Sequence, residues 1–301
     1  MSAEQIESIF TIPMAIQAVE QAYREKHEGQ SGTWPMVFHE FDPGHADLDI
    51  KSGHQGGAGL YRLKVVSWFE ANPGKGLPAL LGTSLLFDLS TGAPRALLNA
   101  GPITHYRTGA AAAITALPGL ERVLLTDPKF PENGEKLCPS ITQTVDELLK
   151  AGGVSRQAEL LPVDLEAGVK QADIIFTATP AYEPYLKAEW VRPGTHLSCI
   201  GADSSGKEEV EPELFATARV FGDDEGQCLS VGECEIPHKK GILTGLLGKI
   251  GSVMAGAVPG RTSPEDITLF DSTGIVLQDL ASAASILKAA DQAGLGTNVE
   301  I

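Results

Sequence analysis

After residue 104 the chain alternates short apolar runs with helix-like stretches, and this alternation constrains the fold more than any other feature. The runs are RVLLTD, AELLPV, DIIFTATP, THLSCIGAD and ARVFGDD, and segments such as ITQTVDELLKAGG and DLEAGVKQA separate them. Short β-branched runs that alternate with helical segments indicate βαβ units and a parallel sheet. The second half of the chain is therefore predicted to be an α/β domain.

The first half of the chain has a different rhythm, with few helical patterns. A predicted helix over IPMAIQAVEQAYREKHEG, with Gly29 at its end, precedes the apolar segments PMVFHEF, DLDIKSG, LYRLKVVSWF and PALLGTSLLFD. In DLSTGAPRALL a Thr-Gly pair separates two apolar runs, which is typical of a hairpin. We expect an antiparallel or mixed sheet here, and two domains: residues 1–113 with 274–301, and residues 114–273.

The composition excludes several classes of partner. Acidic residues outnumber basic ones by 39 to 23, and the net charge of −16 disfavours nucleic acid and anionic membranes. No apolar run approaches the length of a membrane span, no signal-type segment follows Met1, and the four cysteines form no CxxC pair. The expectation is a cytoplasmic protein with reduced thiols and without a metal site.

Four cations in the first half are candidates for binding a carboxylate. In LYRLKVVSWF, strand alternation places Arg62 and Lys64 on one face. Two cations on an otherwise apolar strand indicate either an edge strand with both side chains in water or a carboxylate-binding pair. Lys51 in DIKSG and Arg107 in HYRTGAA are candidates to join them.

Polar residues also follow the predicted strands of the second half. Asp203 comes directly after THLSCI, where an acid can move a proton or merely cap a turn. Thr177 and Thr179 end DIIFTATP, where their hydroxyls face a cofactor or cap a turn. Asp127 ends RVLLTD, the place of the acid that takes two ribose hydroxyls in dinucleotide-binding folds, and an acid there favours NAD(H) over NADP(H). No segment has the GxGxxG loop that should precede it.

Several long segments resemble the ornithine cyclodeaminase/μ-crystallin family. The stretch from LKVVSWFEANPGKG to HYRTGAAAA is similar to the family's N-terminal signature, and DIIFTATP, LSCIGADSSGKEEVEPEL and GRTSPEDITLFDSTGIVLQDLASA are similar to its later motifs. The motifs follow in the family's order over nearly the whole chain. The resemblance implies a homodimer, each subunit pairing a substrate-binding and dimerisation domain with a Rossmann-like domain, and it implies NAD(H) as the cofactor.

The resemblance also implies roles for individual residues. Lys64 corresponds to the lysine that binds the substrate carboxylate, and Arg107 to the arginine of the RTxAA motif near substrate and cofactor. Asp203 corresponds to the catalytic acid. The remaining implied contacts are those of Gly201, Ala202, Lys207 and Ser272 with the cofactor and of Thr273 with the substrate.

The chain departs from the family pattern in two places. The family often has an arginine after a proline in the region of TWPMVFHE, where this chain has Met36 and Val37, and Arg62 is the candidate replacement. Family members also place a strand, a GxGxxQ-type loop and a helix before the strand that ends in Asp127, whereas here Ala116 is followed directly by LPGLERV. One βα unit of roughly 30 residues is therefore missing. A shortened or spliced form, a sheet re-closed with its second strand beside the fourth, and a loss of nucleotide binding all remain open.

Two classes of function compete on this sequence. The first is an enzyme in which Lys64 and Arg107 hold the carboxylate of a small α-amino or α-imino acid and Asp203, across a shared cleft, handles the proton while the nicotinamide exchanges hydride with Cα. A hydride that stays transferred gives a dehydrogenase or an imine reductase, whereas one that returns gives a cyclodeaminating lyase that converts ornithine to proline and ammonia. The second class is a non-catalytic, crystallin-like binding protein or an inactive shortened form.

Overall fold

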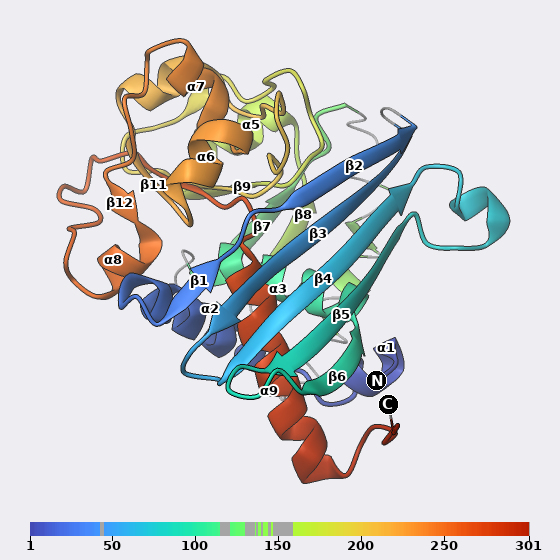
Figure 1. Ribbon diagram of the computed structural model, residues 1–301. Coiled ribbons are helices and arrows are strands. Elements are labelled where there is room, and N and C mark those ends of the chain that lie inside the picture. The colour runs from blue at the N-terminus through green and yellow to red at the C-terminus, as the bar shows by residue number, and fades with distance from the viewer. Residues whose placement is uncertain are drawn as a thin grey trace. The chain divides into compact units, whose positions relative to one another are not determined.

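The chain forms two compact units in the computed structural model, which describes residues 1–42, 45–114, 121–129, 136, 138, 139, 141–143, 146 and 159–300. One unit comprises residues 1–111 with 275–301 and the other residues 112–274 (Figure 1). The first holds an antiparallel sheet and the second a parallel sheet, so the predicted fold class is confirmed. The helix expected over ITQTVDELLKAGG lies mostly outside the described residues.

The first unit is built on a six-stranded antiparallel sheet. Its strands lie in the order β1 (Ser31–Thr33), β3 (Ala46–Gln55), β4 (Leu60–Phe69), β5 (Leu80–Asp88) and β6 (Pro94–Asn99), and β2 (Val37–Asp42) pairs with the first half of β3. β5 and β6 form the predicted hairpin, and Gly92 in its turn has φ +73°, a value that favours glycine. β4 lies between β3 and β5. The alternative that Arg62 and Lys64 lie on an edge strand is therefore wrong.

Helices cover one face of this sheet, and α9 (Val276–Ala293) matters most for the site. It packs against β3, β4 and α2 (Ile12–His27), and Figure 1 shows it running behind the sheet. Every residue from 276 to 283 is buried, including the polar ones. The unit also contains α1 (Ala3–Glu7), the 3₁₀ turn η1 (Pro73–Lys75) and most of α3 (Ala100–Ile114). The first turns of α9 thus bring side chains into the core beneath β4.

The second unit is built on a five-stranded parallel sheet. Its strands lie in the order β12 (Gly248–Lys249), β11 (Arg219–Gly222), β13 (Thr268–Asp271), β10 (His196–Cys199) and β9 (Ile174–Thr177). Its shorter elements are α5 (Leu165–Gln171), η2 (Ala188–Trp190), η3 (Pro212–Ala216), α6 (Glu225–Val231), α7 (Glu235–Lys239) and α8 (Ile250–Met254). Leu197, Val220 and Leu269 from three adjacent strands form the centre of its core. Within the described segments no helix is long and apolar enough to cross a membrane.

The parallel sheet stops at β9, and two further strands stand apart from it. β7 (Arg122–Leu125) pairs only with β8 (Glu159–Pro162) among the residues that the structure describes. A cavity of about 750 Å³ lies between β7 and β9 and is lined by both strands and by α5. In a re-closed sheet the second strand, β7, would pair with the fourth, β9. The cavity lies between these two strands, so this alternative is wrong.

The backbone hydrogen bonds of β9 show that the cavity beside it lies where a neighbouring strand could pair. The carbonyl oxygens of Asp173 and Thr177 accept hydrogen bonds from His196 N and Ile200 N of the neighbouring strand, both at 2.9 Å. Alternate residues of a parallel strand direct their N–H and C=O groups to opposite neighbours, so Phe176 directs its groups towards the cavity. A further strand placed in the cavity could form backbone hydrogen bonds with the edge of β9.

Candidate active site

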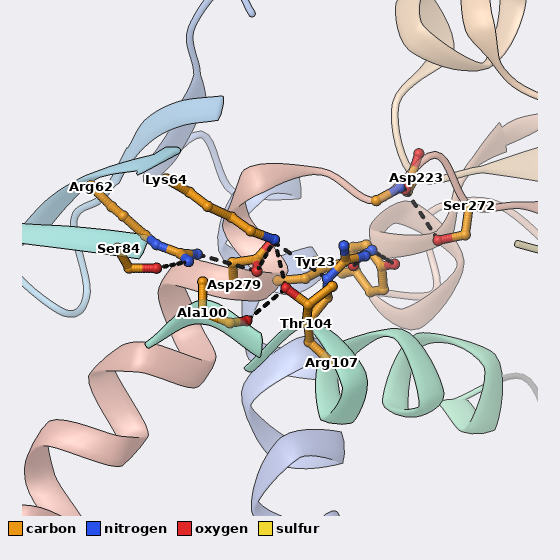
Figure 2. Close-up of polar contacts among 12 residues, drawn as sticks. Tyr23, Arg62, Lys64, Ser84, Ala100, Thr104, Arg107, Asp223, Ser272 and Asp279 are labelled. Carbon is orange, nitrogen blue, oxygen red and sulfur yellow. Dashed lines mark hydrogen bonds and ion pairs between the residues drawn. The ribbon is translucent and has the colours of Figure 1, made fainter. Parts of the chain in front are cut away.

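Arg62 and Lys64 of β4 point to the buried side of the sheet, towards Asp279 of α9, as Figure 2 shows. Lys64 Nζ donates to Asp279 Oδ1 at 2.9 Å and to Thr104 Oγ1 at 2.8 Å. Arg62 is fully buried; its Nη1 lies 3.4 Å from Asp279 Oδ1, and its Nη2 donates to Ser84 Oγ. The predicted placement of the two cations on one strand face is confirmed, and the solvated alternative is excluded.

Arg107 of α3 reaches the same carboxylate from another direction (Figure 2). Its Nε lies 3.4 Å from Asp279 Oδ2, and its Nη1 donates to Gln278 Oε1 at 3.0 Å. Gln278 Nε2 in turn donates to the hydroxyl of Tyr23 at 2.7 Å. The guanidinium is therefore packed and oriented by Gln278 of α9, which Tyr23 of α2 holds in turn.

Three cations converge on the carboxylate of Asp279. Lys51 adds a fourth positive charge nearby, because it lies directly opposite Lys64 in the β3–β4 ladder. Burial, and then the charges of Arg107 and Arg62, lower the pKa of Lys64 well below its ordinary value, and burial lowers the pKa of Arg62 to about 9. Buried cations in excess are costly unless an anion joins them. The cluster is therefore suited to accept a small carboxylate.

In the second unit, Asp203 follows β10 and is half-exposed. Its Oδ1 accepts a hydrogen bond from Lys207 Nζ at 2.6 Å. Gly201 and Ala202 precede it, and the amide of Gly201 donates to Glu209 Oε2 at 3.2 Å. The carboxylate of Asp203 thus lies at the carboxyl end of a parallel strand, where ligands of open α/β sheets bind.

The threonines at the end of β9 differ from one another in their surroundings. Thr179 donates to Glu209 Oε1 through both its amide, at 2.6 Å, and its hydroxyl, at 2.8 Å. The hydroxyl of Thr179 thus donates within the unit, to an acid 30 positions away in the chain. Thr177 is buried at the end of the strand. The bonds of Thr179 to Glu209 close no turn, so the cofactor-facing roles of Thr177 and Thr179 remain predictions.

Ser272 and Thr273 follow β13 and are buried around the carboxylate of Asp223. Their hydroxyls lie 3.3 and 2.9 Å from Asp223 oxygens, and the amide of Gly274 donates to Asp223 Oδ2 at 3.1 Å; Figure 2 draws the contact with Ser272. One carboxylate therefore fixes the orientation of the whole Ser-Thr-Gly turn.

The chain has the predicted acid for the ribose of a dinucleotide but no glycine loop for its pyrophosphate. Asp127, the predicted ribose ligand, lies at the carboxyl end of β7, where its Oδ1 accepts from the amide of Lys129 at 3.0 Å. The sequence has no glycine loop, and the cavity between β7 and β9 takes the place of the strand that would lead to such a loop. No described residue replaces that phosphate cradle.

Sequence reasoning missed the carboxylates and polar groups that hold these side chains in place. The missed residues are Tyr23, Thr104, Glu209, Asp223, Gln278 and Asp279. A signal was available for two of them, since Gln278 and Asp279 are adjacent polar residues in a helix whose neighbours are apolar or small. Glu209 gave no such signal, because it lies in the acidic run KEEVEPEL, which is typical of a solvated loop.

Comparisons with known proteins agree with this architecture. A model of the ornithine cyclodeaminase/mu-crystallin family matches residues 1–117 and 159–293. Alanine dehydrogenase of Archaeoglobus fulgidus is 33% identical over 326 positions that cover all of this chain and 97% of the relative. That alignment is 25 positions longer than the 301 residues of this chain. At least 25 aligned positions of the relative therefore have no counterpart in this chain. The deficit is close to the size of the expected missing βα unit.

Two solved structures resemble both units of the chain. An archaeal alanine dehydrogenase dimer with bound NAD has a TM-score of 0.84 and 30% identity and is aligned over 100% of this chain and 98% of that one. The iminosuccinate reductase of Paracoccus denitrificans in complex with NAD⁺ has a TM-score of 0.85 and 27% identity, again over 100% and 98% of the two chains. Both similar structures hold bound NAD.

Proposed function

The chain belongs to the ornithine cyclodeaminase/mu-crystallin family, and we propose that it is an NAD(H)-dependent oxidoreductase that acts on a small α-amino or α-imino acid. The observation that carries the proposal is the buried convergence of Arg62, Lys64 and Arg107 on Asp279. The NAD-bound alanine dehydrogenase and iminosuccinate reductase support both the cofactor and the class of substrate.

The substrate carboxylate binds at Lys64 and Arg107 in this proposal. Asp279 contacts both cations. The ammonium group of Lys64 and the guanidinium group of Arg107 each carry several N–H donors, so each can bind a second acceptor in addition to Asp279. A carboxylate at this point offsets the excess positive charge and raises the pKa of Lys64 back towards its ordinary value. Arg62, fully buried behind them, acts on the substrate through Asp279, and Lys51 contributes its charge from β3.

Asp203 is the proposed proton-transfer group. It is half-exposed, and its partner Lys207 leaves one carboxylate oxygen available to a ligand nitrogen or a water. NAD(H) supplies hydride exchange with Cα of the substrate. Thr273, Ser272 and Asp127 are the proposed contacts of this chain with substrate and cofactor. The mechanism requires Lys64 and Asp203 to act on one substrate molecule.

The active form is proposed to be a homodimer, as in the archaeal alanine dehydrogenase dimer. Leu63, Leu85 and Leu97 are paired in register across three strands on the sheet face opposite Arg62, and Leu97 is 58% exposed. The same unit exposes many further large apolar side chains: Trp34, Met36, Val37, Phe38, Phe41, Leu80 and Leu81. The exposed Leu85 and Leu97 on this face support an interface there.

The dimer is tested by measuring the mass of the protein by light scattering after size-exclusion chromatography. The wild-type protein is expected at twice the chain mass, and Leu97→Glu at the chain mass. Leu295→Glu, which changes an exposed leucine after α9, is the control and should stay dimeric. A monomeric wild type at micromolar concentration would overturn the proposal.

The activity is tested by absorbance at 340 nm with NADH and three substrates: pyruvate with ammonia, cyclic imino acids, and ornithine. A fall in absorbance with a keto or imino acid is the expected result. Proline and ammonia formed from ornithine without net change in NADH would indicate the lyase instead. The missing glycine loop favours a third outcome, a non-catalytic protein, and no change in nicotinamide fluorescence at millimolar NADH would establish it.

A further inference from the structure

Glu209 is a fully buried acid that the proposed chemistry does not use. Its Oε1 accepts three hydrogen bonds, from the amide and hydroxyl of Thr179 and from the hydroxyl of Tyr185 at 2.8 Å. Its Oε2 accepts one from the amide of Gly201 at 3.2 Å. Four donors on one carboxylate compensate for its loss of water.

The donors come from two different strand ends. Thr179 follows β9 and Gly201 follows β10, so one carboxylate joins two loops at the carboxyl edge of the sheet. The joint is tight, because a Cβ added to Gly201 would lie 2.4 Å from the carbonyl oxygen of Thr179 and 2.5 Å from Glu209 Oε2. The distance between the two loops is therefore fixed by this contact.

A second acid holds Glu209 in position. Glu233 Oε1 accepts from the amides of Glu209 and Val210 at 2.8 and 2.7 Å. Burial, and then the charge of Glu209, raise the pKa of Glu233 well above its ordinary value. Glu233 thus fixes the backbone at Glu209 through two hydrogen bonds.

We propose that Glu209 is a positioning residue that sets the spacing of the β9 and β10 strand ends and, through Gly201, the place of Asp203. The inference rests on the proposed function, because Asp203 is the proton-transfer group there. Its first consequence, the fixed loop, concerns only this chain and is measurable without cofactor or substrate.

The first test is amide hydrogen exchange of cofactor-free Glu209→Gln by NMR. A glutamine has one side-chain oxygen, and the three donors that bind Oε1 keep that oxygen in the Oε1 position. The NH₂ group of the glutamine then faces the N–H of Gly201, which loses its acceptor. Exchange at Gly201 is expected to accelerate about tenfold or more, with that at Thr179 nearly unchanged, since only the N–H of Gly201 loses its acceptor. Equal exchange at Gly201 in wild type and variant would overturn the proposal.

Glu208→Gln is the matched control, because it removes the neighbouring buried carboxylate, whose Oε1 has no hydrogen-bond partner within the described residues. It should leave both exchange rates as in the wild type. If Glu209→Gln does not fold, Glu209→Asp replaces it: its shorter carboxylate reaches only one strand end, so one of the two amides loses protection. Protection of both in that variant contradicts the proposal.

The second test separates a positioning role from a merely structural one. In Glu209→Gln, kcat is expected to fall about tenfold or more while the KM for the amino or imino acid stays within about twofold, because the carboxylate-binding cations lie in the other unit. An unchanged kcat together with faster Gly201 exchange would overturn the link to Asp203. If the wild type shows no turnover, the proposed function fails, and the exchange experiment alone decides the role of Glu209.

Discussion

Lys64 Nζ and Asp279 Oδ1 form a buried ion pair at 2.9 Å, between the central strand β4 and the first turn of α9. Both side chains are at most 3% exposed. The two residues are 215 positions apart in the chain, so the pair joins the N-terminal sheet to the C-terminal helix within one unit. Asp279 also contacts Arg62 and Arg107, which makes it the residue on which the geometry of the cation cluster depends.

Asp279→Ala is expected to destabilise the protein strongly. Removing one partner of a buried ion pair leaves the other charges uncompensated, at a cost of about 3–5 kcal/mol. Urea unfolding followed by circular dichroism measures the loss. Asp291→Asn, an exposed acid on the same helix, is the control and should unfold within about 0.5 kcal/mol of the wild type. A loss below 1 kcal/mol for Asp279→Ala would show that the cations do not depend on it.

Lys64→Met is expected to weaken substrate binding more than it slows the chemical step. A charge-assisted hydrogen bond is worth about 1.5–3 kcal/mol, so KM for the amino or imino acid should rise about 10- to 100-fold. Steady-state kinetics at saturating NADH measures the change. The control, Lys75→Met, removes an exposed lysine of the same unit and should leave KM unchanged. An equal KM in Lys64→Met and wild type would remove Lys64 from the substrate site.

Asp203→Asn is expected to abolish turnover and leave the fold intact. Proton transfer by a positioned side chain contributes about 10²–10⁴-fold to the rate, whereas a half-exposed ion pair such as that with Lys207 contributes about 0–1 kcal/mol to stability. Asp173→Asn breaks another exposed ion pair, with Arg192, and serves as the control for both readouts. Activity within tenfold of the wild type would refute the catalytic role of Asp203.

The stability of the protein should depend on pH through Asp271. Burial, and then the charge of Asp223, raise the pKa of Asp271 to about 7. The folded state therefore keeps a proton that the unfolded state loses near its ordinary pKa of 3.8. The resulting contribution to stability is fully present below 3.8 and is lost as pH rises to about 7.

The difference in unfolding free energy between wild type and Asp271→Asn isolates this contribution. An asparagine can keep its oxygen on the amide of Cys234, which donates to Asp271 Oδ2 at 3.0 Å, and place its amide group at Oδ1. We expect the wild type to lose stability relative to this variant between pH 4 and 7. Parallel curves over that range would show that Asp271 ionises normally.

Much of the fold follows from local patterns in the sequence. The alternation in LYRLKVVSWF predicted that Arg62 and Lys64 share a face, and Gly29 and Gly92 mark a helix end and a turn as predicted. Strand order does not follow from such patterns. The pattern left Arg62 and Lys64 equally consistent with an edge strand, and only the pairing of β4 with two neighbours settles their burial.

The polar contacts of the site were the least predictable part. Asp279 lies far from Lys64 in sequence, and the polar pair Gln278–Asp279 among apolar and small neighbours indicates burial without identifying the partners of the acid. Re-closure of the shortened sheet was equally open from sequence, because it depends on whether β7 reaches β9, a tertiary relationship. Roles for Lys64, Asp203 and the cofactor-facing residues remain predictions that the variants above address.

The central claim, that this chain transfers hydride between NAD(H) and Cα of a small imino or amino acid, is tested most directly by isotope transfer. Purified protein is incubated with NADH deuterated at C4 of the nicotinamide and with pyruvate plus ammonia or a cyclic imino acid, and the amino acid formed is analysed by mass spectrometry. We predict one deuterium at Cα in the product from the wild type and no product from Asp203→Asn. An amino acid formed without deuterium, with cofactor deuterated on the transferred face, would contradict the account.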